Sequence, residues 1–178
     1  SHAHGDHIGD AAPIAERCGC TVFCTPETGA MLHAPHARQE NGQPGGRIQT
    51  EFGSVKFLPA EHGSGAPGGV ACGFLIEIGG KRIYFAGDTG LMADMVLLAG
   101  EEIDAAPLPT GDRYTMGPED AGVPPSRGGE NRHPGGGAET WGSDHAVKIA
   151  SYERLVMRVS HTFGRLYSSH CSYMYMIN

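Results

Sequence analysis

The stretch Ser1-His2-Ala3-His4-Gly5-Asp6-His7-Ile8-Gly9-Asp10 decides how the rest of the chain is interpreted, because it places three histidines and an aspartate within six residues. In an extended segment, side chains two residues apart point to the same side, so His2 and His4 can converge on one cation. Asp6 and His7 follow where the chain turns into a helix, so they project from a different part of the loop. Two groups of ligands presented close together are what a two-metal site needs.

The ligand types in this cluster favour particular metals. Imidazole and carboxylate groups suit zinc, manganese or iron, and the lack of a thiolate within the cluster argues against a structural cysteine-zinc site. The alternative is a solvated histidine-rich loop or the remnant of a tag. The amphipathic helix that the pattern predicts directly after the cluster favours metal binding over that alternative.

Two more candidate ligands stand at the ends of predicted strands. His62 follows an apolar strand, in Pro59-Ala60-Glu61-His62, and Asp88 follows the strand that begins at Lys81, in Ala86-Gly87-Asp88-Thr89-Gly90. Each is weak alone, since an Asp before Thr-Gly is more often a helix cap or a turn residue. Together with the amino-terminal cluster they are predicted ligands, and the Asp88 carboxylate is suited to bridge two cations.

Strands and helices interleave along the first two thirds of the chain, and this predicts a mixed sheet flanked by helices. Asp6 is the predicted cap of one helix that Gly19 ends, and Thr25 with Pro26 is typical of a second helix start. Gly79-Gly80 is a hairpin signal between two strands. The expected strands are residues 21–24, 54–58, 73–78, 81–86 and 103–108; further helices are expected at 91–98 and from 118, and a polar loop at 39–46.

Bulk properties exclude several classes of protein. A chain of 178 residues suits one domain, and a net charge of −7 argues against a nucleic-acid partner. No apolar run approaches the roughly 18–20 residues of a membrane span, and no secretory signal is seen. Five cysteines without a C-x-x-C pair are interpreted as free thiols of a cytoplasmic protein.

The chain divides into two unlike parts. Up to Ala121 there are 16 acidic and 7 basic residues, whereas from Gly122 onward there are 4 and 6. Residues 123–137 have almost no apolar side chains, which predicts a linker or disorder, and residues 149–159 have the pattern of one amphipathic helix. We therefore expect a folded core over 1–121 and an atypical, poorly ordered tail over 122–178.

The order of these motifs resembles the metallo-β-lactamase superfamily. Residues 4–10, 86–90 and 108–121 (Leu-Pro-Thr-Gly-Asp-Arg-Tyr-Thr-Met-Gly-Pro-Glu-Asp-Ala) are similar to its branch of small, largely uncharacterised metal-dependent hydrolases of bacteria and archaea. The resemblance implies an α+β fold, an αββα sandwich with the metals at one edge between the sheets. It also implies the ligand sets: His2, His4 and His62 for one cation, and Asp6 and His7 for the second, with Asp88 bridging.

The chain departs from the family pattern at both ends. The family has a β-hairpin and another strand before the histidine cluster, so the resemblance implies that the sandwich is incomplete and the chain truncated at its amino end. The family also has a last metal-binding histidine near its carboxyl end, in a His-Tyr-x-Thr-Phe-like setting. His161-Thr162-Phe163 weakly resembles that setting. We expect neither His161 nor the other tail histidines, His133, His145 and His170, to replace that ligand.

The function expected from these residues is metal-dependent hydrolysis. Two divalent cations, zinc before manganese or iron, would activate a water molecule for attack on an ester, thioester, amide or phosphodiester bond. Asp6 is the predicted catalytic group, since it can orient that water or pass a proton to the leaving group. The expected partner is a small-molecule substrate, whose identity the sequence leaves open together with the oligomeric state. The alternative is an inactive metal-binding fragment of such a hydrolase.

Overall fold

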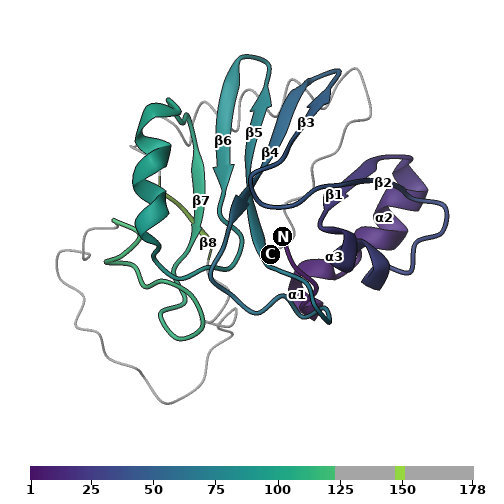
Figure 1. Ribbon diagram of the computed structural model, residues 1–178, viewed down its shortest axis with the longest axis horizontal. Helices are drawn as coiled ribbons and strands as arrows, with labels where there is room; N and C mark the ends of the chain where they lie inside the picture. The colour runs from purple at the N-terminus through teal and green to yellow at the C-terminus, as the bar shows by residue number, and fades with distance from the viewer. Residues whose placement is uncertain (123–146, 151–178) are drawn as a thin grey trace, which may run out of the picture.

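A computed structural model describes residues 1–122 and, for the backbone alone, Val147–Ala150. Its centre is an antiparallel sheet in the order β3-β4-β5-β6 (Figure 1). The segment that leads into β7 runs parallel to β6, with the Tyr84 N–H donating to the Ala105 carbonyl over 2.9 Å, so the sheet is mixed, as predicted. The strands are β3 (Arg47–Thr50), β4 (Gly53–Pro59), β5 (Cys72–Ile78), β6 (Lys81–Phe85), β7 (Ala106–Pro109) and β8 (Val147–Ala150), which pairs with β7.

Both faces of this sheet are packed. One face presents Val55, Phe57, Phe74 and Ile83, and Phe23 of β1 (Thr21–Cys24) packs against it. The other presents an apolar cluster that includes Leu58, Leu75 and Tyr84, with Leu98 of the 3-10 helix η1 (Ala93–Gly100) against it. A helical layer therefore covers one face and a second small sheet covers the other.

The second sheet consists of β1 and β2 (Arg38–Asn41), which run parallel. Alternation along β1 turns Phe23 toward the main sheet and Val22 and Cys24 toward the helical side, where they pack near Leu32 and Ala11. The layers are thus η1, main sheet, small sheet and helices, which is the expected αββα order (Figure 1). The helices of this side are α1 (Gly5–Ile8), α2 (Ala11–Cys18) and α3 (Pro26–Met31).

Local sequence signals predicted several turns and helix ends correctly. Gly79 and Gly80 have φ angles of 56° and 72°, which a two-residue hairpin turn requires, and they join β5 to β6. Thr25 caps α3 by accepting a hydrogen bond from the Thr28 N–H, with Pro26 at the first position. Gly19 ends α2 in the left-handed conformation.

Other local predictions were wrong. The single helix expected after Asp6 is two helices, because Gly9, with a φ of 33°, breaks it, and His4 rather than Asp6 occupies the position before α1. Part of the expected polar loop at 39–46 belongs to β2, and β3 was not predicted at all. Residues 91–98 overlap a 3-10 helix, and the helix expected from Pro118 is a turn closed by the Ala121 N–H and the Gly117 carbonyl at 3.0 Å.

Most of the tail lies outside the described residues. The backbone of Ile149 and Ala150 is in β8, so the helix predicted over 149–159 is wrong at its start, and 151–159 is not described. The predicted linker and the tail histidines (His133, His145, His161 and His170) also lie outside the described residues. In the part of the chain that is described, no helix has the length and apolar content to cross a membrane.

Candidate metal centre

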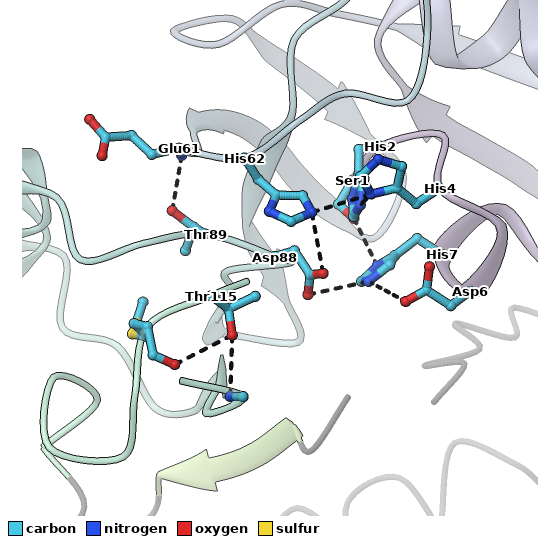
Figure 2. Close-up of polar contacts among 12 residues, drawn as sticks. Ser1, His2, His4, Asp6, His7, Glu61, His62, Asp88, Thr89 and Thr115 are labelled. Carbon is cyan, nitrogen blue, oxygen red and sulfur yellow. Dashed lines mark hydrogen bonds and ion pairs between the residues drawn. The ribbon is translucent and has the colours of Figure 1, made fainter. Parts of the chain in front are cut away.

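Three segments far apart in the sequence meet at one edge of the fold. The extended Ser1–His4 segment is tied to the loop after β4 by a hydrogen bond of 2.7 Å from the Ala3 N–H to the Ser64 carbonyl. The Cys72 N–H at the start of β5 donates to the Ser1 carbonyl over 3.0 Å. The loop after β6 carries Asp88 to the same place (Figure 2). Because β4 and β6 both run antiparallel to β5, the loops that follow them leave the main sheet at the same edge, and this strand order assembles the site.

The first group of candidate donors is made of three imidazoles. One ring nitrogen each from His2, His4 and His62 lie within 4.8 Å of one another. The His4 Nδ1 atom is 2.9 Å from His2 Nε2 and 3.2 Å from His62 Nε2. A neutral imidazole has only one N–H, so three nitrogens that face one point can turn their lone pairs toward a shared cation. This arrangement fits the donor set of a divalent metal.

The second group lies beside the first and consists of His2, His7 and Asp88. Asp88 Oδ1 is 3.2 Å from His7 Nε2, and Asp88 Oδ2 is 3.5 Å from His62 Nε2. The two oxygens of one carboxylate thus reach one histidine of each group (Figure 2). Among the described residues, these two groups are the sets of His, Cys, Asp and Glu whose atoms come close enough to hold an ion.

Asp6 lies at the rim of the site. Its Oδ2 atom is 3.4 Å from His7 Nε2, and a third of its side chain is exposed, so it is more accessible than Asp88. It belongs to neither donor group. Its roles as a metal ligand and as the catalytic group stay predictions.

Burial and neighbouring charges hold His2 and Asp88 in the protonation states that bind metal. Burial is the main reason why the pKa of His2 falls to about 3, with neighbouring histidines adding to the effect, so this imidazole is neutral at pH 7. Burial alone would raise the pKa of Asp88, but the hydrogen bond from His7 and the charges of the surrounding histidines outweigh it and hold that pKa below its usual value. A neutral imidazole and an ionised carboxylate are the forms that bind metal.

The metal-free protein is expected to lose stability as the pH falls from about 6.5 toward 3. The unfolded chain binds a proton at His2 near pH 6.5, whereas the folded chain resists it down to about 3, so the contribution of this group is complete above 6.5 and is lost below it. Urea unfolding of chelator-treated protein across this range measures the effect. The His2→Gln variant should lose much of the slope, and an unchanged slope would contradict the prediction.

Two residues that the sequence analysis did not single out hold the ligand loops together. The Thr89 side chain is fully buried, and its Oγ1 accepts a hydrogen bond of 3.0 Å from the Glu61 N–H, next to His62. The Thr89 carbonyl accepts another from the Met116 N–H at 2.8 Å. Ser1 Oγ lies within hydrogen-bond distance of His2 and His7. The sequence signal that could have identified them is their position next to a predicted ligand, since Thr89 follows Asp88 and Ser1 precedes His2.

The loop over residues 110–117 is built by turn contacts. Asp112 has a φ of 65°, its N–H donates to the Met116 carbonyl at 3.3 Å, and the Gly111 N–H donates to Thr115 Oγ1 at 3.2 Å. These contacts make Asp112 a turn residue of this loop. Met116 is buried, which fits a packing role.

A four-layered αββα sandwich with clustered imidazoles and a carboxylate at one edge defines the class of metallo-β-lactamase-fold proteins. The model of the family described as "Beta-lactamase superfamily domain" matches residues 1–128. The chain belongs to this family.

Curated relatives agree with this assignment. A UPF0173 metal-dependent hydrolase of Symbiobacterium thermophilum is 53% identical over 127 residues, which are 69% of this chain and 57% of the relative. Another, of Deinococcus radiodurans, is 47% identical over 127 residues, 68% of this chain and 56% of the relative. The chain therefore spans a little more than half of the length of the curated relatives that it matches.

Solved structures support the same fold. Igni18, a metallo hydrolase from the archaeon Ignicoccus hospitalis, is similar with a TM-score of 0.58 and 38% identity, over 67% of this chain and 54% of that protein. YhfI of Bacillus subtilis, a metallo-beta-lactamase fold protein, has a TM-score of 0.55 over 68% of this chain and 56% of its own, and at 16% identity it supports the fold alone.

Proposed function

We propose that this chain carries the metal-binding half of a metal-dependent hydrolase that uses two divalent cations. One cation would be held by His2, His4 and His62, and the other by His7, Asp88 and Asp6, with Asp88 shared between them. The observation that carries the proposal is that the two oxygens of Asp88 reach His7 and His62, one histidine of each donor group. Zinc suits this mixture of imidazole and carboxylate donors, and manganese or iron are the alternatives.

Each residue has a task that follows from its environment. A bound divalent cation would lower the pKa of water, so that hydroxide is available at neutral pH. His2 offers a neutral imidazole from a buried position, and Asp88 supplies negative charge between the donor groups. Asp6, at the accessible rim beside His7, would orient the attacking water or pass a proton to the leaving group.

The bond that is cleaved is an ester, thioester, amide or phosphodiester bond of a small molecule. The fold does not choose among these bonds, since one fold supports many reactions. The net charge of −7 makes a long nucleic acid the least suitable substrate. The free thiols of Cys18, Cys20, Cys24 and Cys72 suit a reducing compartment, which supports our proposal of a cytoplasmic location.

Metal analysis and hydrolysis by the purified, zinc-loaded protein test this function. We expect about two zinc ions per chain and turnover of p-nitrophenyl acetate, a thioester or bis(p-nitrophenyl) phosphate. The His4→Ala variant should lose zinc and turnover together, because His4 Nδ1 is the atom that both other imidazoles face.

His36→Ala is the matched control, because His36 is exposed and belongs to neither donor group. It should keep both zinc and turnover. Two bound zinc ions without turnover of any of the three substrates would favour the inactive metal-binding fragment. The absence of stoichiometric zinc from the folded protein would contradict both functions.

A further inference from the structure

We propose that the Ser1 hydroxyl is a positioning group that sets the tautomer and the ring orientation of both His2 and His7. A single side chain would thereby prepare one ligand of each donor group. This inference rests on the proposed function and extends it to a residue that donates nothing to the metal itself.

The geometry places this hydroxyl on the remote side of both rings. Ser1 Oγ is 3.1 Å from His2 Nδ1 and 3.3 Å from His7 Nδ1. The other nitrogen of each ring, Nε2, faces the donor atoms: His2 Nε2 is 2.9 Å from His4 Nδ1, and His7 Nε2 is 3.2 Å from Asp88 Oδ1. In Figure 2 a dashed line joins Ser1 to His7, and other dashed lines join His7 to Asp88 and Asp6.

The chemistry of neutral imidazole explains why a partner at Nδ1 matters. An imidazole that binds a cation through Nε2 must carry its one proton on Nδ1, and that N–H then needs an acceptor. A serine oxygen has two lone pairs, so it can accept from two N–H groups at once. The Ser1 hydroxyl therefore matches the requirement of His2 and of His7 together.

The structure also fixes Ser1 in place. Its carbonyl accepts hydrogen bonds from the Cys72 N–H at 3.0 Å and from Cys72 Sγ at 3.3 Å. On the other side, a Cβ atom added to Gly87 would lie 2.7 Å from Ser1 Cβ, so the glycine before Asp88 makes room for this serine. A hydroxyl that is held by its backbone and by close packing orients the two rings with little loss of entropy on metal binding.

The test compares Ser1→Ala with Ser54→Ala. Ser54 is also buried, but it lies in β4. Its Oγ accepts a hydrogen bond of 2.8 Å from Arg47 and donates one of 3.4 Å to Glu77, and neither of these is a candidate ligand. Cobalt(II) is titrated into metal-free protein and followed by its visible absorption. We expect Ser1→Ala to weaken binding about 10- to 100-fold, with both equivalents affected, and Ser54→Ala to bind as the wild type does.

A second measurement reports the ring tautomers directly. Nitrogen-15 chemical shifts should report the proton on Nδ1 of His2 in metal-free wild type, and a mixture of His2 tautomers in Ser1→Ala. The His7 ring, whose Nε2 donates to Asp88 in the metal-free protein, should carry its proton on Nδ1 once zinc is bound. The inference is overturned if the metal-free wild-type His2 ring or the zinc-loaded His7 ring carries its proton on Nε2, or if Ser1→Ala binds cobalt with wild-type affinity. If the wild type binds no cobalt, the proposed function fails, and the ring shifts alone decide the role of Ser1.

Discussion

Replacing His2 by alanine is expected to empty the first metal position and to weaken the second. His2 is the one residue that belongs to both donor groups, and it is buried with a relative exposure of 1%. Zinc bound to the purified variant should fall from about two ions per chain to about one or fewer. Removing a residue that only hydrogen-bonds to a metal ligand lowers metal affinity or activity about 10- to 100-fold. Removing the ligand itself should therefore lower hydrolysis by more than about 100-fold.

Elemental analysis and turnover measured on the same preparation check this result. Because a buried imidazole also fills space, His2→Gln is compared with His2→Ala, and circular dichroism establishes that both fold. His36→Ala serves again as the control, since its side chain is exposed. Retention of two zinc ions by folded His2→Gln would show that His2 is not a metal ligand.

The Gly65→Ala substitution should have the second-largest effect, although it changes no ligand. A Cβ atom at Gly65 would lie 2.8 Å from the Ala3 carbonyl carbon, the His4 N atom and His4 Cδ2, and two of these are backbone atoms that cannot move aside alone. Gly65 also has a φ of +67°, which disfavours alanine. We expect a loss of about 3 kcal/mol in the free energy of unfolding, together with weaker metal binding as His4 is displaced.

The control for this prediction is Gly68→Ala. Gly68 has nearly the same φ, +70°, but an added Cβ atom there would meet nothing within 4 Å. It should lose only the backbone contribution, about 1 kcal/mol, and bind metal as the wild type does. Urea unfolding and a cobalt titration of both variants separate the two effects. Equal losses of stability and affinity in the two variants would argue against the contact with His4.

What the sequence predicted well was encoded locally. The Gly79-Gly80 turn and the Thr25-Pro26 helix start depend on the conformations that these residues themselves prefer. His62 and Asp88 do follow strands, β4 and β6, as expected, and the structure brings both beside the amino-terminal histidines. Their role as ligands remains a prediction.

What the sequence did not predict depends on contacts across the fold. Nothing in the polar residues of β2 predicts a strand, which exists because β1 supplies a parallel partner. The close approach of Gly65 to His4, and of Ser1 to Gly87, involves residues that are more than sixty positions apart for one pair and more than eighty for the other. Donor grouping is equally non-local, because each group joins the amino-terminal histidines to a residue of a distant loop, and Asp6 falls outside both groups.

The contact between His4 and His62 has a consequence for folding. These two side chains are separated by 58 residues in sequence, and a cation held by both would close that stretch of chain into a ring. Such a cross-link removes conformations from the unfolded chain, and its benefit grows with the length of the ring. Free metal in the surroundings would then set the fraction of molecules that are folded, so scarcity of zinc would act on the abundance of the protein as well as on its chemistry.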